Sequence, residues 1–375
     1  VTNTKLAHTL DQIGLHGSDY LYETMAPTLA VEVQAAGGVL TVEDLQAYTV
    51  LEHEPITVQI MGHTLYSASG SSSGGAAVAG ILEFMDGFAQ PLASEGLVYN
   101  HRLVEAMKNA FAVRLNLADP LFVNTTGPIG ALTSKTFMSQ LRNAMSDTGV
   151  LPLASYGGKF GLNEARRYLP EDHGTSHMVV VDRSGNAVSL TSTVNTYFGS
   201  KVVSPSTGIV FNNQMDDFSN SHSANYFGLA PSASNLPGPG KRPLSSMSPS
   251  ILIDSNSRVR LVGGASGGPR IITATAQVIL NTIGRGHDIL QAVVSPRLHS
   301  QLLPDTVYVE QHQLISGLSI TSPPNIAEDL KKRGHNITEW AHSMGVSQFV
   351  AIDPDTGYMT AVSDPRKSGR PAAIH

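Results

Sequence analysis

Residues 172–193 read DHGTSHMVVVDRSGNAVSLTST, and they mark the point where a helical first half of the chain gives way to a β-rich second half. Met178–Val181 is an apolar run, residues 183–186 (Arg-Ser-Gly-Asn) are typical of a turn, and Ala187–Thr193 alternates apolar with polar side chains. This order predicts a β-hairpin that begins a few residues after a flexible stretch.

Two further hairpins are predicted downstream of this one. Ile251–Asp254 and Val259–Val262 form the first pair, and Gln348–Asp353 and Tyr358–Ser363 form the second. A helix is expected between them at Arg270–Ile283. Helices outside stacked antiparallel hairpins make an α/β layered sandwich the expected architecture.

The first half of the chain is predicted to be mostly helical, with one short pair of strands. Apolar residues recur at three- and four-residue spacing in the expected helices, which are Leu6–Ile13, Tyr20–Gln34, Glu43–Tyr48 (capped by Thr41), Ala76–Met85, Val98–Asn116 and Ser134–Met145. Strands are predicted at Ile56–Ile60 and Thr64–Ser67. Residues 146–174 show no sustained period, and we interpret them as a linker that ends at Gly174.

Composition narrows the class of protein. The chain has 375 residues, 41% of them hydrophobic, which is enough for a large core. Its net charge of −6 and its charged fraction of 14% disfavour nucleic acid as a partner. The absence of Cys excludes disulfides, thiolate metal sites and a Cys nucleophile. No apolar run approaches the ~20 residues of a membrane span, and the first residues lack a signal peptide, so we expect a soluble chain.

Metal and phosphate motifs are not found. His53-Glu54 lacks the second His of a zinc-protease helix, and Gly240-Lys241 lacks both the upstream Gly and the following Ser or Thr of a phosphate-binding loop. We therefore expect neither a metal nor a cofactor.

Two stretches are candidates for a nucleophile. Gly70–Gly74 (GSSSG) fits a nucleophile elbow between a strand and a helix, with Ser72 as the nucleophile of a serine hydrolase, although a flexible Ser/Gly loop explains it as well. Thr175 stands directly after Gly174, which has no side chain to obstruct attack on its carbonyl. A Thr freed at a new N-terminus can use its own α-amine, with a pKa near ~8, as the base. An ordinary strand start is the alternative.

Longer stretches of the sequence favour Thr175 over Ser72 as the nucleophile. The chain contains VVVDRSGNAVSLTSTVNTYFG (179–199), SPSTGIVFNNQMDDFS (204–219), GKRPLSSMSPSI (240–251), GGASGGPRIITAT (263–275), SPRLHSQLLPD (295–305) and AVSDPRKSGRPA (361–372). Together with Thr175-Ser176-His177 these resemble the small chain of gamma-glutamyltransferases. AAGGVLTVEDLQAY (35–48) and VEAMKNAFAVRLNLADP (104–120) resemble the later part of that family's large chain. The resemblance covers essentially the whole sequence.

The resemblance implies a four-layer αββα sandwich of the N-terminal-nucleophile hydrolase type. It implies self-cleavage between Gly174 and Thr175, so that residues 1–174 end the large subunit, residues 175–375 form the small one, and the two remain paired. Thr175 would be both the processing residue and the nucleophile, oriented by Thr193. The implied substrates are glutathione and other gamma-glutamyl compounds, with water, an amino acid or a peptide as acceptor.

The same resemblance assigns the substrate site. Asn195, Gln214 and Asp217 would face the α-ammonium of the glutamyl group, and many members of the family carry Glu where this chain has Gln214.

Other residues would hold the rest of the substrate. Ser245 and Ser246 would hold its α-carboxylate, and the N–H groups of Gly267 and Gly268 would form the oxyanion hole. Residues 219–240 correspond to a loop over the pocket, with Phe227 near the position of an aromatic lid.

The family's large chain begins upstream of Val1, so the sequence looks truncated at its N-terminus. The missing part supplies an Arg for the substrate carboxylate, and no residue here is assigned that role. A catalytically inactive member that keeps part of the glutamyl pocket is therefore the second hypothesis, and a serine hydrolase using Ser72 is the third. By resemblance, the protein is expected outside the cell, in a periplasm or on the outer face of a membrane.

Overall fold

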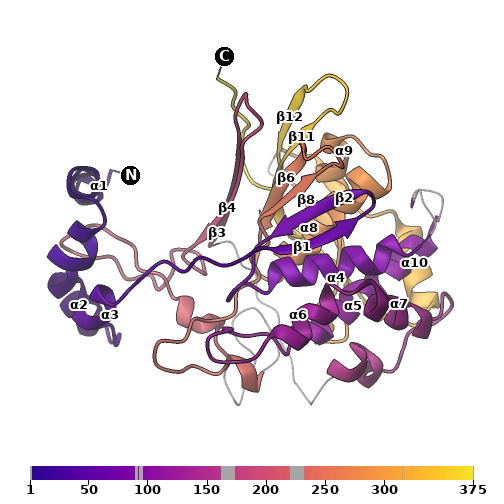
Figure 1. The fold of residues 1–375 in the computed structure, drawn as a ribbon, viewed down its shortest axis with the longest axis horizontal. Helices are drawn as coiled ribbons and strands as arrows, with labels where there is room; N and C mark the ends of the chain where they lie inside the picture. The colour runs from indigo at the N-terminus through magenta and orange to yellow at the C-terminus, as the bar shows by residue number, and fades with distance from the viewer. Residues whose placement is uncertain are drawn as a thin grey trace. The chain divides into compact units, whose positions relative to one another are not determined.

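The structure is a computed structural model, and it describes residues 2–88, 92, 96–161, 174–219, 232–314 and 316–374. The chain divides into two compact units (Figure 1). The first unit comprises Val1–His53 and Thr193–Gln214, and the second comprises Glu54–Ser192 and Met215–His375. Each unit joins segments that are far apart in the sequence, and each is described by itself below.

The first unit is built on short helices close to the predicted positions, but the single helix expected at Tyr20–Gln34 is divided into two elements at Met25. They are α1 (Thr4–His16), η1 (Tyr20–Thr24), α2 (Ala26–Ala35) and α3 (Val42–Gln46). Thr41 forms a capping box with Asp44, so that two unpaired N–H groups at the start of α3 are satisfied. α2 ends just before Gly37 and Gly38, whose N–H groups donate to carbonyls in its last turn.

Residues 193–214 complete the first unit by hydrogen bonding to these helices. The Thr9 hydroxyl donates to the carbonyl of Thr207 over 2.9 Å, and the Ser204 hydroxyl donates to the Glu32 carboxylate over 2.5 Å. Gly208 has φ +71°, and a Cβ there would lie 2.4 Å from Oδ1 of Asn3, which caps α1. The segment around Ser206-Thr207-Gly208, which belongs to the motif at 204–219, therefore fastens residues 193–214 to α1 and α2.

The second unit is centred on a six-stranded antiparallel sheet. In spatial order its strands are β1 (Ile56–Ile60), β2 (His63–Ser67), β5 (Ser250–Ile253), β6 (Val259–Ser266), β11 (Val346–Ile352) and β12 (Met359–Ser363). Neighbouring strands are all antiparallel. The predicted hairpins at 56–67, 251–262 and 348–363 are thus confirmed as three consecutive pairs of one sheet.

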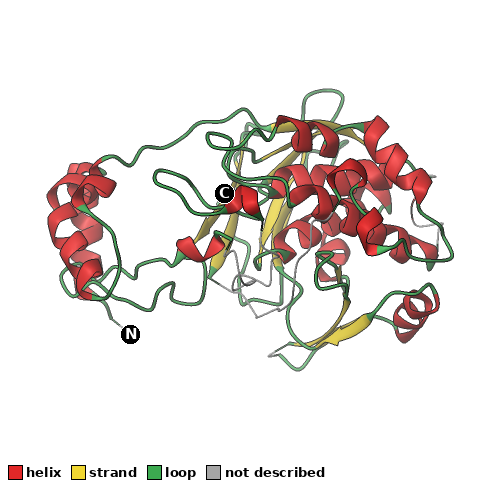
Figure 2. Ribbon diagram, turned by 90° about the horizontal axis from the view of Figure 1, so that it is seen from below, coloured by secondary structure: helices red, strands yellow, loops and turns green. Residues whose placement is uncertain are grey.

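Helices cover one face of this sheet (Figure 2). α4 (Gly74–Asp86) and α8 (Arg270–Ile279) pack against the strands, and α5 (Val98–Arg114) packs against α4. Every residue of α8 is buried, and so is every residue of α4 before Asp86. This burial explains their Ala- and Ile-rich sequences. Smaller helices flank them, namely α6 (Thr126–Leu132), α7 (Lys135–Ala144), η7 (Leu280–Gly284) and α9 (Ile289–Val294).

The hairpin of β3 (Thr175–Val181) and β4 (Ala187–Thr193) forms a second, two-stranded sheet. β3 lies against β6 and β11 (Figure 1), so the second unit has a helix layer, a sheet and a facing hairpin in succession. Ser189 links the hairpin to the sheet, because its hydroxyl donates to the carbonyl of Gly263 in β6 over 3.0 Å. The His177 ring, hydrogen-bonded to the Thr191 hydroxyl over 2.9 Å, packs against Gly264. Burial lowers the pKa of His177 to about 4.

Gly264→Ala should destabilise the protein by about 1–3 kcal/mol, because a Cβ at Gly264 would lie 2.5 Å from the buried His177 ring. Gly14, inside α1, has no atom within 4 Å of such a Cβ, so Gly14→Ala should be neutral or slightly stabilising. The free energy of unfolding, measured in denaturant for both variants, checks this. Equal effects would contradict the close packing of β3 on β6.

A third sheet was missed by the sequence analysis. β8 (Val307–Gln313) pairs with β7 (Leu298–His299), with β9 (Ser319–Thr321) and, in parallel, with β10 (Ile337–Trp340), and α10 (Pro324–Lys332) precedes β10. These strands are short or mix charged residues with apolar ones, so the alternation is weak. β8, for example, reads VYVEQHQ.

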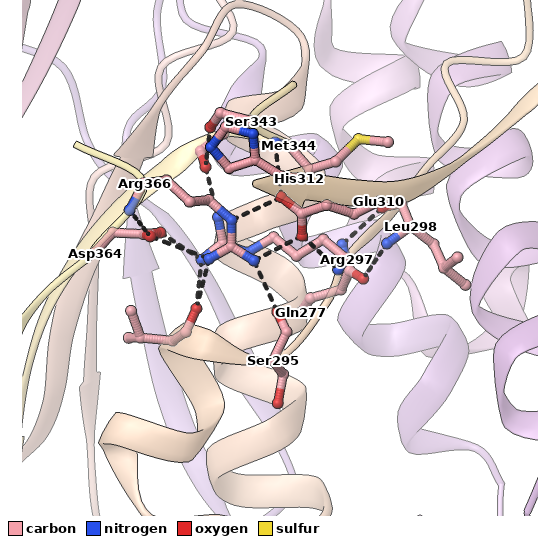
Figure 3. Close-up of polar contacts among 12 residues, drawn as sticks. Gln277, Ser295, Arg297, Leu298, Glu310, His312, Ser343, Met344, Asp364 and Arg366 are labelled. Atoms are coloured by element: carbon pink, nitrogen blue, oxygen red, sulfur yellow. Dashed lines mark hydrogen bonds and ion pairs between the residues drawn. The ribbon is translucent and has the colours of Figure 1, made fainter. Parts of the chain in front are cut away.

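Four buried charged residues connect this third sheet to the six-stranded one (Figure 3). Arg297 precedes β7, Glu310 lies in β8, and Asp364 and Arg366 follow β12. Arg366 is bidentate to Glu310 at 2.6 and 2.7 Å and also contacts Asp364 at 3.0 Å, and Arg297 contacts Asp364 at 2.7 Å. Two of the family motifs, SPRLH and SDPRK, therefore each supply one Arg to a neutral network.

The prediction of an unstructured linker at residues 146–174 is partly wrong. Leu153–Ser155 and Gly158–Phe160 form 3₁₀ turns, and Tyr156 between them is 1% exposed, with its hydroxyl donating to Glu105 over 2.7 Å. Single buried residues of this kind leave no periodic signal. The rest of the linker, residues 162–173, lies outside the described residues. Among the described helices, none combines the length and the apolar character that a membrane span requires.

Candidate active site

Thr175 is held at the head of β3. It is 4% exposed, and its carbonyl accepts a hydrogen bond from Nζ of Lys367 over 3.0 Å. Lys367 follows Arg366 directly, and the buried ion pairs of Arg366 fix the backbone there. The second unit therefore places Thr175 at a defined, enclosed position, as a nucleophile requires.

Gly267 and Gly268 form a tight turn between β6 and α8. Their φ angles are +127° and +57°, and a Cβ at Gly267 would lie 3.0 Å from Cα of Gly345. Both residues are buried, and neither backbone N–H is hydrogen-bonded to any residue in the described part of the chain. Two such N–H groups at the positive end of α8 can stabilise an anion.

The glycine turn and Thr175 are tied to the same end of the six-stranded sheet. Ser347 in β11 pairs with Ala265, two residues before Gly267. The N–H of Asp364 donates to the Ser347 carbonyl over 3.1 Å, and Lys367, three residues on, reaches Thr175. One strand end thus positions both the candidate nucleophile and the candidate oxyanion hole.

The Ser245–Ser246 pair is organised by a buried guanidinium that sequence reasoning did not identify. Arg114, the last residue of α5, is 2% exposed. Its Nη2 donates to Oγ of Ser246 over 2.9 Å, and its Nε donates to Oγ of Ser73 over 2.8 Å. The Ser73 hydroxyl in turn donates to the Ser245 carbonyl over 2.7 Å. Because Arg114 occupies a lone pair of Ser246, the hydroxyl proton of Ser246 is available for a carboxylate.

Asp217 is the charged partner of this group. Burial lowers the pKa of Arg114 to about 10, and the negative charge of Asp217 opposes that decrease. Nδ2 of Asn235 donates to the backbone carbonyl of Asp217 over 2.7 Å and so fixes its backbone. A carboxylate and two serines therefore gather around one buried cation, an arrangement suited to a zwitterionic ligand.

Three predicted site residues belong to the first unit. Thr193 ends β4, and its hydroxyl oxygen accepts from the N–H of Asn195 over 2.8 Å. Asn195 is 2% exposed, has φ +74° and donates from Nδ2 to the carbonyl of Asn213 over 3.1 Å, which leaves Oδ1 to accept. The N–H of Gln214 donates to Oδ1 of Asn212 over 2.8 Å. Each unit thus carries its own part of the predicted site.

Ser72 has the context of a nucleophile elbow but not its hydrogen bonding. It lies between β2 and α4, as predicted. Its hydroxyl donates to the carbonyl of Met247 over 2.5 Å, and Ser72 forms a β-bridge with Ser245. No histidine among the described residues is hydrogen-bonded to the Ser72 hydroxyl, so this loop holds the Ser245–Ser246 segment in place.

The residues that sequence reasoning missed had weak signals. Arg114 continues the apolar stripe of α5 through Met107 and Phe111, where a buried apolar residue is expected and a charge is the anomaly. Lys367 offered no signal beyond its place in a family motif. Phe227, the expected aromatic lid, lies outside the described residues.

An antiparallel sheet with helices on one face and the hairpin of β3 and β4 against the other agrees with the fold of the N-terminal-nucleophile hydrolase class. In line with this, a cephalosporin acylase from Bacillus halodurans superposes with a TM-score of 0.80 at 25% identity, covering 99% of this chain and 62% of that one.

The chain belongs to the gamma-glutamyltranspeptidase family, whose profile matches residues 1–374. It is 40% identical over 379 residues to glutathione hydrolase 2 of Arabidopsis thaliana, covering 99% of this chain and 64% of that protein. It is 36% identical over 371 residues to the glutathione hydrolase proenzyme of Escherichia coli, covering 98% of this chain and 60% of that protein. The chain thus spans about three fifths of the length of these relatives.

Proposed function

We propose that this chain carries the catalytic machinery of a gamma-glutamyl hydrolase and transferase in which Thr175 is the nucleophile. The single observation that carries the proposal is the position of Thr175, buried at the head of β3 and anchored through Lys367 near the glycine turn. Membership of the gamma-glutamyltranspeptidase family supports the substrate class.

Maturation would proceed in two steps. Oγ of Thr175 attacks the carbonyl carbon of Gly174, the C–N bond breaks, and the acyl group moves from nitrogen to oxygen. Water then hydrolyses this ester, which leaves a carboxylate on Gly174 and a free α-amine on Thr175. Residues 1–174 and 175–375 would stay together as a heterodimer of large and small subunits, and the protein would act outside the cytosol, as family resemblance suggests.

Turnover would use the new amine as the base. Oγ of Thr175 gives its proton to the α-amine and attacks the gamma-glutamyl carbonyl of glutathione, while the N–H groups of Gly267 and Gly268 stabilise the oxyanion. The C–N bond breaks, the leaving amine of cysteinylglycine takes the proton, and a glutamyl ester remains on Thr175. Water or an amino-acid or peptide amine then releases the glutamyl group.

Recognition would rest on the charges of the glutamyl group. Ser245 and Ser246 would hold the α-carboxylate, and Asp217, with Asn195 and Gln214, would hold the α-ammonium. Gln214 is neutral, so Asp217 would supply the negative charge of this subsite. Thr193 would orient Thr175.

Intact mass spectrometry on protein from the longest reading frame tests the proposal. We expect a split between Gly174 and Thr175 and turnover of a gamma-glutamyl anilide by the processed protein. Ser72→Ala should still be cut between Gly174 and Thr175 and should keep measurable turnover, because the Ser72 hydroxyl only supports the Ser245–Ser246 segment. An uncut, inactive wild type would instead favour the inactive family member, and activity lost only in Ser72→Ala would favour the serine hydrolase.

Arg114→Lys should raise KM for the gamma-glutamyl donor by ~10-fold or more and change kcat by less than about 3-fold. A lysine cannot donate in the fixed fork geometry that reaches both Ser73 and Ser246, so the carboxylate subsite loosens while Thr175 stays in place. Arg258→Lys, at an exposed pair with Asp254, is the control and should leave both constants unchanged. A fall in kcat alone would contradict a role in binding.

A further inference from the structure

A second polar cluster lies in the core of the second unit and takes no part in the chemistry proposed above. It consists of His101 and Glu105 on α5 and His335 just after α10. One ligand atom from each residue lies within 4.8 Å of the others, and the three residues are 0%, 0% and 4% exposed. Nine residues of helix, ~14 Å at 1.5 Å per residue, separate Glu105 from Arg114.

Neighbouring groups orient two of the three side chains as they would around a metal ion. Nε2 of His101 is hydrogen-bonded to the carbonyl of Ser146 over 2.8 Å, so its proton sits there and Nδ1 carries the lone pair. Oε1 of Glu105 accepts from the hydroxyl of Tyr156, which leaves Oε2. A backbone carbonyl behind an imidazole and a hydroxyl behind a carboxylate are the usual outer contacts of metal ligands.

The cluster also contains polar atoms that the protein does not satisfy. Oε2 of Glu105 and Nδ1 of His335 are buried and have no hydrogen-bond partner in the described part of the chain. Each such atom costs about 1–3 kcal/mol when it is left unpaired. A bound cation would pair with Oε2 of Glu105 and so account for the first of these atoms; Nδ1 of His335 is not one of the ligands proposed below.

The surrounding charges favour a cation as well. Three basic residues lie nearby, and each is paired with a carboxylate: Arg102 with Asp147 at 2.6 Å, Lys108 with Asp305 at 2.8 Å, and Arg333 with Asp329 at 2.7 Å. These pairs cancel, and none of the three bases forms an ion pair with Glu105, whose pKa is raised to about 7 by burial.

We propose that His101, Glu105 and His335 form a structural site for a divalent transition-metal ion, with Zn²⁺ as the ion that best suits two imidazoles and one carboxylate. Nδ1 of His101 and Nε2 of His335 are 2.8 Å apart and share a proton. Tetrahedral Zn²⁺ holds such nitrogens ~3.4 Å apart, so binding separates them slightly. The shared proton then moves to Nδ1 of His335, both rings stay neutral, and water supplies the fourth ligand.

Such an ion would join three segments that are distant in the sequence. It would fasten α5 to the turn after α10, and, through His101 and Ser146, to the loop that follows α7. Motif searching does not find this site, because its ligands combine an i, i+4 pair on one helix with a histidine 230 residues further on.

The test is Zn²⁺ titration of the full-length protein after it has been stripped with a chelator, followed by isothermal calorimetry and metal analysis. We expect one Zn²⁺ per chain with a Kd below ~1 µM, weaker than the structural sites of zinc fingers, which have more protein ligands. Glu105→Gln should weaken binding by at least ~100-fold, since removing an outer contact alone costs ~10–100-fold. His299→Gln, at a fully buried histidine outside the cluster, should bind as the wild type does.

Two further readouts keep the proposal open to refutation if Glu105→Gln fails to fold. Co²⁺ bound to the stripped wild type should give the strong visible absorption of a four-coordinate site, and His335→Gln should abolish it. Zn²⁺ at 100 times Kd should raise the folding equilibrium constant of the wild type ~100-fold. Absence of stoichiometric binding to the wild type, or equal binding by folded Glu105→Gln and His335→Gln, would overturn the proposal. None of these readouts depends on Thr175.

Discussion

Thr175→Ala should leave the precursor uncut and reduce gamma-glutamyl turnover by at least ~10⁴-fold, the scale of loss when a nucleophile is removed. The reason is that the hydroxyl of Thr175 would carry out both the maturation cleavage and the acyl transfer. Thr175 is buried and its carbonyl is held by Lys367, so its hydroxyl occupies a defined position that alanine leaves without a nucleophile. Intact mass spectrometry and steady-state kinetics measure the two effects separately.

Thr175→Ser is the control for this experiment. Serine keeps the hydroxyl and loses only a methyl group, so cleavage should persist and turnover should stay within ~100-fold of the wild type. A gamma-glutamyl electrophile should label the wild type and the Ser variant but not the Ala variant. Full activity in Thr175→Ala would show that another residue is the nucleophile, and the assignment to Thr175 would be wrong.

The sequence predicts the six-stranded sheet well, because its hairpins alternate over several residues and end in recognisable turns. β1 was predicted at the residues where it is found, and β2, β5, β6, β11 and β12 differ from prediction by a few residues. The third sheet was not predicted because β8 has a charged residue, Glu310, at its centre. Partners distant in the sequence stabilise this buried carboxylate, namely Arg366 and the N–H groups of Arg297 and Met344. Long-range pairing of this kind leaves no local pattern.

The candidate site also contains residues that local sequence predicts and residues that only the folded structure reveals. Glycines before a helix indicate an anion site from local chemistry alone, and the turn at Gly267 and Gly268 has the positive φ angles that such a turn requires. Thr175 needed the family resemblance, since a Thr at a strand start is common. Arg114 and Lys367 act through contacts with residues 132 and 192 positions away, so only the folded chain brings them into the site.

Arg366→Met should lower the free energy of unfolding by about 3–5 kcal/mol, because it leaves two buried carboxylates, Glu310 and Asp364, short of a cation. Burial alone would raise the pKa of Asp364, but Arg297, Arg366 and the N–H of Ser347 hold it below the usual value. The carboxylate therefore contributes stability above the unfolded pKa of ~4 and loses that contribution as the pH falls through its folded value.

Denaturant unfolding at several pH values measures this effect. The wild type should lose stability below pH ~4, and Arg366→Met should lose less, since less of the interaction remains to be titrated. Arg258→Met, at the exposed pair with Asp254, is the matched control and should cost less than ~1 kcal/mol. The double variant Arg366→Met with Glu310→Gln should recover part of the loss, because removing both partners leaves fewer uncompensated charges.

This network also bears on catalysis, because Arg366 holds the backbone from which Lys367 reaches the carbonyl of Thr175. Any Arg366→Met protein that still folds should therefore cleave slowly at Gly174 and turn over poorly, whereas Arg258→Met should be indistinguishable from the wild type in both assays. Full cleavage and full turnover in a destabilised Arg366→Met protein would mean that the ion pairs stabilise the fold without positioning the nucleophile.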